Sequence, residues 1–173
     1  MRSIGARLAT WYALTATVLF ASLSVAGYFL LQTHLIRGLD LLNAAEFAQI
    51  KARLGADYHG LDRSGVDARI RETTEYSSVL FYIDIHSGTQ TLFRSSNLHG
   101  ESIPDVRGER VFDAHVTGVG ELRVGEFILA PFDVMIATPV QPVRRVMEGY
   151  VEVCGILLAI MLALSAIVGY VLS

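Results

Sequence analysis

The side chains best suited to chemistry in this 173-residue chain are its five histidines, because imidazole is a good ligand for zinc and copper. A metal site needs three or four donors that converge, and no two histidines have the spacing of one helical turn or of a tight loop. The single cysteine, Cys154, excludes a thiolate cluster and an intrachain disulfide. We therefore assign no metal, and His86, His99 and His115 remain only candidates. A histidine could also sense acid, because its charge changes near neutral pH.

A predicted loop over residues 97–108 carries the best candidates for binding a small ligand. Arg94, His99, Glu101 and Asp105 lie on or beside it, and binding residues concentrate on loops. At each position an ordinary solvated side chain is the competing interpretation. The sequence has no phosphoacceptor motif and no glycine-rich nucleotide loop, so we expect neither catalysis nor a cofactor in this chain. A net charge of −3 also argues against nucleic acid as a partner.

Two apolar runs must position this segment. Residues 8–31 carry no charge and would reach roughly 36 Å as a helix, enough to cross a bilayer. Residues 153–173 form the second uncharged run. The first run could instead belong to a cleavable signal peptide led by Arg2 and Arg7, but it exceeds the apolar core of about 7–15 residues typical of such peptides. We therefore expect two transmembrane helices in contact with membrane lipid.

Small residues recur every four positions along the second run. Such spacing lets another helix approach closely, although glycine and alanine are also simply common in membrane helices. The residues expected to form this packing face are Gly155, Ala159 and Ala163.

The basic residues predict how the two helices are oriented. Arg2 and Arg7 precede the first run without any acidic residue, which places the tail of residues 1–7 in the cytoplasm. Residues 32–152 then lie outside the cytoplasm, although basic residues near both outer ends weaken this bias. The chain ends inside the second apolar run, and we expect it to be a fragment cut near the inner membrane face.

Between the two runs, helices come first and strands follow. Apolar residues at three- and four-residue spacing predict a helix over residues 32–54, continuous with the first span and ending at Leu54 and Gly55. A shorter helix is predicted over residues 66–76, and a final helix begins near Pro142 and enters the second span. Alternating apolar residues and turns predict five strands, at 78–86, 89–95, 110–116, 121–129 and 133–139. The expected fold class is α+β with a long N-terminal helix, and the antiparallel arrangement of the sheet is implied by the family resemblance that follows.

This order of elements resembles the N-terminal sensor region of bacterial sensor histidine kinases. The opening RSIGARLATWYALTATVLF, the helix LIRGLDLL and the exit stretch PVQPVRRVMEGYVEV are similar to the branch that contains the heavy-metal sensors. The resemblance implies a PAS-like (PDC-like) periplasmic sensor domain over residues 32–152, an inner-membrane location and a homodimer. It also implies a HAMP linker and a kinase after Ser173, which would use ATP and magnesium and pass phosphate to a cytoplasmic response regulator.

The function implied by this resemblance is to sense an unknown periplasmic ligand and to regulate the kinase by helix movement in the dimer. The metal-binding histidines of that branch have no match at the histidines of this chain. The alternative is a two-span structural or assembly subunit of the cell envelope whose outer domain binds another protein.

Overall fold

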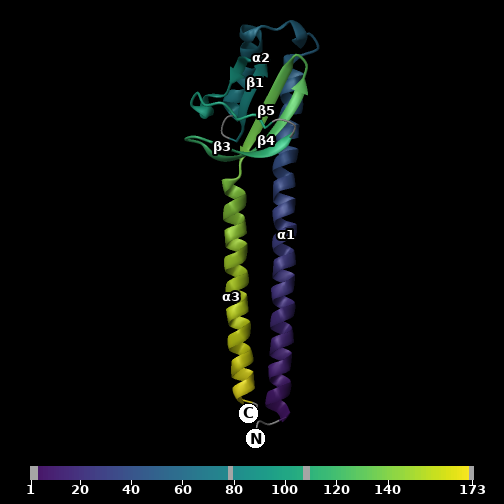
Figure 1. Cartoon of the computed structure of the whole chain (residues 1–173), viewed down its shortest axis with the longest axis vertical. Coiled ribbons are helices and arrows are strands. Elements are labelled where there is room, and N and C mark those ends of the chain that lie inside the picture. The colour runs from purple at the N-terminus through teal and green to yellow at the C-terminus, as the bar shows by residue number, and fades with distance from the viewer. Residues whose placement is uncertain (1–3, 78–79, 107–109, 172–173) are drawn as a thin grey trace. The chain divides into compact units, whose positions relative to one another are not determined.

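The computed structural model describes residues 4–77, 80–106 and 110–171, which fall into two compact units (Figure 1). One unit contains the chain up to Leu35 and again from Val143 onward. The other unit is Ile36–Pro142. The described residues of the first unit are all helical, and the second unit holds a sheet with its helices.

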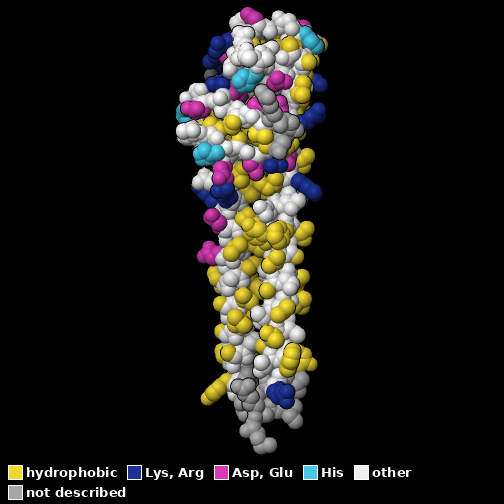
Figure 2. All heavy atoms as spheres, viewed as in Figure 1, with side chains coloured by type: hydrophobic (Ala, Val, Ile, Leu, Met, Phe, Trp, Pro, Cys, Tyr) yellow, Lys and Arg dark blue, Asp and Glu magenta, His cyan; other side chains and the backbone are white. Residues whose placement is uncertain are grey.

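Two long helices make up the first unit. α1 extends over Ile4–Leu54, so it also supplies the first helix of the second unit, and α3 extends over Gln141–Val171. Both helices are long and apolar enough to cross a membrane. Figure 2 shows hydrophobic side chains along their visible face. The two candidate spans expected from the apolar runs are therefore present as helices.

Within this unit the two helices contact each other at one tyrosine of α3. The hydroxyl of Tyr150 donates a hydrogen bond to the carbonyl oxygen of Ser24 at 3.0 Å, and its ring lies 6.5 Å from the ring of Tyr28. A Cβ atom on Gly27 would collide with that hydroxyl. Glycine at position 27 therefore makes room for the Tyr150 side chain between the two helices.

The predicted packing face of α3 does not take part in this contact. Gly155, Ala159 and Ala163 are all exposed, and no atom lies within 4 Å of a Cβ built on Gly155. The half-buried positions on α3 follow instead from Tyr150 at three- and four-residue spacing, at Cys154, Leu158, Met161 and Ser165. A contact of the small residues with another helix stays a prediction.

The second unit is built on one five-stranded antiparallel sheet in the order β2-β1-β5-β4-β3. Two hairpins, β1–β2 and β3–β4, flank β5, which pairs with one strand of each. This confirms the α+β class and the antiparallel sheet. The strand bounds are Tyr82–Ser87 (β1), Gln90–Arg94 (β2), Val111–Val116 (β3), Gly120–Leu129 (β4) and Phe132–Pro139 (β5).

The sheet has one face covered by helices, here called the helix face. Alternate residues of β1 and β5, such as Ile83 and Ile136, pack there against Ile50 of α1 and Ile70 of α2 (Arg63–Ser77). All four side chains are at most 1% exposed, and burying each removes its apolar surface from water. This packing accounts for the position of the shorter helix on the sheet.

The opposite side, here called the loop face, is covered by the segment from Ser95 to Val106. Leu98 and Ile103 of that segment are buried in a cluster with residues of β3, β4 and β5. The segment begins with a short 3-10 helix, η2 (Ser96–Leu98), that the sequence did not predict. A further 3-10 turn, η1 (Tyr58–Gly60), lies between α1 and α2.

The C-terminal part of α1 is bound to β4 by polar and aromatic contacts. Arg123 Nε lies 2.8 Å from Asp40 Oδ1, and the side-chain amide of Asn43 donates to the Arg123 carbonyl at 3.0 Å. One turn later, the rings of Phe47 and Phe127 stack with centroids 4.5 Å apart. These contacts fix which side of the C-terminal part of α1 faces the sheet.

The helix ends where the sequence predicted. Gly55 has a φ of 80°, the left-handed conformation that terminates helices and that glycine adopts without strain. The carbonyl of Leu54 accepts a hydrogen bond from the guanidinium of Arg69 on α2. That guanidinium also pairs with Asp57 at 2.8 Å, so the turn between the two helices is fixed from both sides.

The first strand is shorter than predicted. The prediction covered residues 78–86; residues 78 and 79 lie outside the described part, and β1 starts only at Tyr82. The side-chain amide of Asn97 donates to the Phe81 carbonyl at 2.8 Å and so occupies a group that a strand partner would need. The other strand and helix predictions agree with the structure to within a few residues.

Candidate functional site

A fully buried carboxylate, Asp84, is the centre of the most unusual polar cluster in the second unit. Its side chain is 0% exposed on the loop face. The Asp84 Oδ1 atom lies 3.0 Å from Nε2 of His86, and Oδ2 lies 3.3 Å from Nη2 of Arg94. The backbone N–H of Ile103 donates to Oδ2 at 3.3 Å. A charge removed from water needs such partners, because desolvating it alone costs several kcal/mol.

The strand register brings this cluster together. Asp84 of β1 and Arg94 of β2 are direct cross-strand partners, so their side chains share one face of the hairpin. His86 lies two residues after Asp84 on the same strand, and alternation returns it to the same face. The hydroxyl of Thr91 lies 3.4 Å from Nδ1 of this histidine.

Arg94 connects the cluster to the segment that covers the loop face. Its Nη1 group donates to the carbonyl of Gly100 at 2.7 Å, while its other nitrogens face Asp84. The start of the segment is held separately: the N–H of Ile83 donates to the Ser95 hydroxyl at 2.9 Å, and that hydroxyl donates to the side chain of Asn97. A change at Arg94 would therefore act on the buried acid and on the covering segment together.

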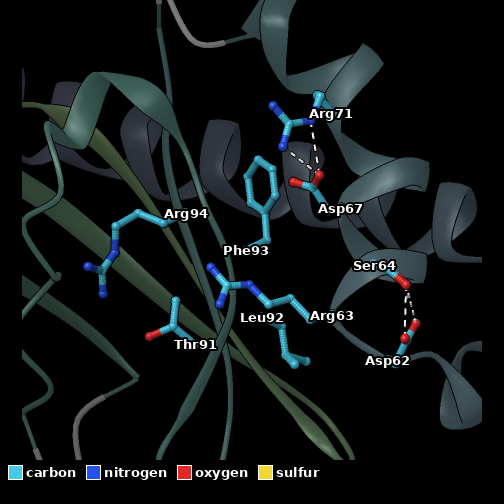
Figure 3. Close-up of a pocket in the computed structure, with 9 residues that line it drawn as sticks. All are labelled: Asp62, Arg63, Ser64, Asp67, Arg71, Thr91, Leu92, Phe93 and Arg94. Carbon is cyan, nitrogen blue, oxygen red and sulfur yellow. Dashed lines mark hydrogen bonds and ion pairs between the residues drawn. The ribbon is translucent and has the colours of Figure 1, made fainter.

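On the other side of Arg94 a groove opens between α2 and the edge strand β2 (Figure 3). It has a volume of about 650 Å³, within the usual range of small-molecule pockets. Its lining residues are Asp62, Arg63, Ser64, Asp67, Arg71, Thr91, Leu92, Phe93 and Arg94.

Some charged side chains around the groove already have an ion-pair or hydrogen-bond partner, and among the described residues one does not. Arg71 pairs with Asp67 one helical turn away, at 2.5 Å. The carboxylate of Asp62 accepts hydrogen bonds from Ser64 and from the Gly65 N–H, and these bonds lower its pKa. Within the described part of the chain, the guanidinium of Arg63 has no such partner.

The four predicted ligand-binding residues come from one neighbourhood but do not converge on one point. Arg94 is in the Asp84 cluster, whereas His99 and Glu101 are exposed on either side of Gly100, whose carbonyl Arg94 contacts. His99 has a φ of 50° and ends η2. Asp105 is exposed farther along the segment. Whether any of them binds a ligand stays a prediction.

The three histidine candidates lie on separate elements. His86 contacts the buried acid from β1, His99 ends η2, and His115 is exposed on the edge strand β3. Among the described residues, no three of the His, Cys, Asp and Glu side chains are placed so that they could hold a metal ion.

One acidic group on β4, Glu126, has a shifted pKa. Partial burial raises the pKa of Glu126, and the nearby charges of Asp105 and Asp133 act in the same direction, while Arg110 opposes them. Asp105 therefore lies close enough to Glu126 of β4 for the two charges to interact.

Sequence reasoning identified Arg94 but missed Asp84 and the other two arginines of the groove, Arg63 and Arg71. An acidic residue between two isoleucines of a β-rich run was the available signal for Asp84, because a carboxylate there must be buried or at an edge. Arg63 and Arg71 have no local signal, since the groove arises only when α2 packs beside β2.

Comparison of the chain with protein-family models, with curated proteins and with solved structures returns no match.

Proposed function

We propose that this chain is the extracytoplasmic sensing and transmembrane-signalling portion of a bacterial sensor histidine kinase. In this proposal α1 and α3 cross the inner membrane, the N-terminus is cytoplasmic, and the sheet unit is a periplasmic PAS-like domain. The chain itself catalyses nothing. A kinase portion that follows it would bind ATP and magnesium and transfer phosphate to a response regulator.

The observation that carries the proposal is the direct connection of both candidate spans to the core of the sheet unit. α1 continues without a break from its apolar part to Ile50 and Leu54, which are buried in the sheet core. At the other end, only Val140 separates the central strand β5 from α3. The backbone therefore offers a continuous path from the sheet core to each candidate span, which is what transmission of a signal requires.

The sheet unit supports the PAS-like part of the proposal. A five-stranded antiparallel sheet with flanking helices is what such a domain requires, and the loop face has a covering segment fixed by a buried polar cluster. A ligand that favoured one arrangement of this segment would shift the population of states, provided it bound the two states with different affinities.

A homodimer is supported by a stripe along α1 that faces away from the sheet. Leu41, Ala45, Ala48 and Ala52 are exposed at spacings of four, three and four residues, the pattern of a coiled-coil seam. Leu41 is 71% exposed although it lies outside the apolar run expected to span the membrane. A second α1 packed along this stripe would bury these side chains.

Cysteine cross-linking in membranes tests the dimer. Cysteines replacing Leu41, Ala45 or Ala48 in a Cys154→Ser background should form disulfide-linked dimers. A cysteine replacing Arg53, which is exposed on the same helix but outside the stripe, is the matched control and should cross-link much less. Equal cross-linking at all four positions would contradict the dimer along this stripe.

The kinase assignment is tested by the reading frame beyond Ser173 and by function. A HAMP-like linker followed by a helix with a His-Glu phosphorylation motif supports the proposal, and a stop codon within a few residues would favour the two-span envelope subunit instead. With the kinase present, autophosphorylation should change when the α1 stripe is locked by cross-linking. If the autophosphorylation rate is the same with and without each cross-link, transmission through α1 is refuted.

A further inference from the structure

We propose that the groove between α2 and β2 binds a small organic carboxylate, with the guanidinium of Arg63 as its anchor. The role of this ligand as a signal rests on the proposed function, whereas its binding to the groove does not depend on that function.

Arg63 is the group in the groove that lacks a partner. It is exposed, and in the described chain no carboxylate or carbonyl oxygen accepts from its guanidinium. Figure 3 shows its side chain extending toward Thr91 and Phe93, away from Asp62 and Ser64. A planar guanidinium that projects toward the groove in this way suits a carboxylate, which it can bind through two parallel hydrogen bonds.

The other arginines of the lining are already used. Arg71 is held by Asp67, and Arg94 by Asp84 and the Gly100 carbonyl. They keep the local potential positive, and either could donate to a ligand only by giving up a partner it already has. Because two aspartates also line the groove, its excess of positive charge is small, which favours a monoanion over phosphate.

The remaining lining defines the rest of the ligand. Leu92 and Phe93 supply the apolar part of the lining through small exposed areas, 6% and 7% of each residue, and the hydroxyl of Thr91 lies 3.4 Å from Nδ1 of His86. A ligand with a short hydrocarbon tail would gain about 0.8 kcal/mol for each methylene it buries against this lining, equivalent to roughly a fourfold gain in affinity. Affinity should therefore rise with chain length over a short series of carboxylates.

The groove shares a wall with the buried cluster, so its occupation has a route to the covering segment. Thr91 and Arg94 belong to both, and Arg94 also contacts Gly100. A carboxylate close to Arg94 would compete with Asp84 and Gly100 for its donors. Binding at the groove and the position of the loop-face segment are thereby coupled.

Isothermal titration of the full chain in lipid nanodiscs, at constant ionic strength, tests the site. The probes are acetate, butyrate and hexanoate, with hexylamine and inorganic phosphate as comparisons. We expect hexanoate to bind more tightly than acetate and hexylamine not to bind. Arg63→Gln should weaken hexanoate binding by about 10- to 100-fold, because it removes a charge-assisted pair of hydrogen bonds. The matched control is Arg53→Gln, an exposed arginine on α1 outside the groove, which should leave the affinity unchanged.

The proposal is overturned if no carboxylate binds the wild-type chain at millimolar concentration, if both arginine variants lose affinity equally, or if phosphate binds as tightly as hexanoate. A chain that binds hexanoate through Arg63 but is followed by no kinase would keep this site and reject the proposed function. If a kinase follows the chain but no carboxylate binds through Arg63, only the proposed ligand is rejected.

Discussion

Replacement of Arg94 by methionine is the sharpest test of the buried cluster. Methionine keeps the length and apolar stem of the side chain but leaves the fully buried Asp84 without its guanidinium. Removing one partner of a buried ion pair costs about 3–5 kcal/mol. The side chain of Arg94 is 25% exposed, and Asp84 keeps His86 and the Ile103 N–H, so we expect about 2–3 kcal/mol.

This loss is large enough to measure as a melting temperature. For a unit of about a hundred residues, 1 kcal/mol corresponds to roughly 4–8 °C, so Arg94→Met should melt about 8–24 °C below the wild type. Differential scanning calorimetry of the full chain in nanodiscs gives this value. Arg63→Met is the control: it changes the same residue type in the same groove, but without a partner, and should cost less than about 0.5 kcal/mol.

A double variant separates the stranded charge from lost packing. Asp84→Asn combined with Arg94→Met removes the buried charge while the asparagine still accepts from Ile103, so it should recover about 1 kcal/mol or more of the loss. The reasoning about Asp84 is wrong if Arg94→Met and Arg63→Met melt at the same temperature. It is also wrong if the stability loss of the double variant equals the sum of the losses of Asp84→Asn and Arg94→Met measured singly.

Three further predictions concern other contacts. Hydrogen bonds from Arg69 hold the pKa of Asp57 at about 2, below its ordinary 3.8, so its stabilisation is present above pH 4 and lost as the pH falls toward 2. Asp57→Asn should therefore melt lower than wild type at pH 7, with a calorimetric difference that vanishes near pH 2. Gly27→Ala should displace the Tyr150 hydroxyl and lower the midpoint of unfolding in sodium dodecyl sulfate, whereas glycine-to-alanine changes elsewhere in a helix stabilise it. Phe132→Ala should cost about 3–5 kcal/mol in urea unfolding, because this ring is 2% exposed in the sheet core; a cost below 1 kcal/mol would contradict the packing.

Local patterns were enough to predict most of the fold. The long apolar periodicity of α1, its glycine stop and the alternation in the strands depend on residues within a turn or a strand of each other. The bounds departed from prediction where a distant side chain intervened, as when Asn97 bonds the carbonyl before β1. This hydrogen bond, just before the first residue of β1, joins residues 16 positions apart, so no pattern of neighbouring residues predicts it.

The candidate site was less predictable for the same reason. Arg94 was identified because it borders a loop, but its partner Asp84 lies ten residues earlier and meets it only through the hairpin register. The groove needs α2 to lie beside β2, an arrangement that sequence spacing does not encode. The exposed Gly155, Ala159 and Ala163 show a further limit, because a small-residue pattern does not say which neighbouring helix it serves.

The position of β5 has a consequence for how the chain is assembled. The β1–β2 and β3–β4 hairpins are neighbours in the sheet only through β5, which is the last strand to be synthesised. Each hairpin must therefore wait with an open edge until residues 132–139 arrive, and α3 follows them almost at once. Closure of the sheet and delivery of the second apolar helix are thus nearly simultaneous events in biosynthesis. A delay in either step would leave exposed strand edges, the usual starting point of aggregation.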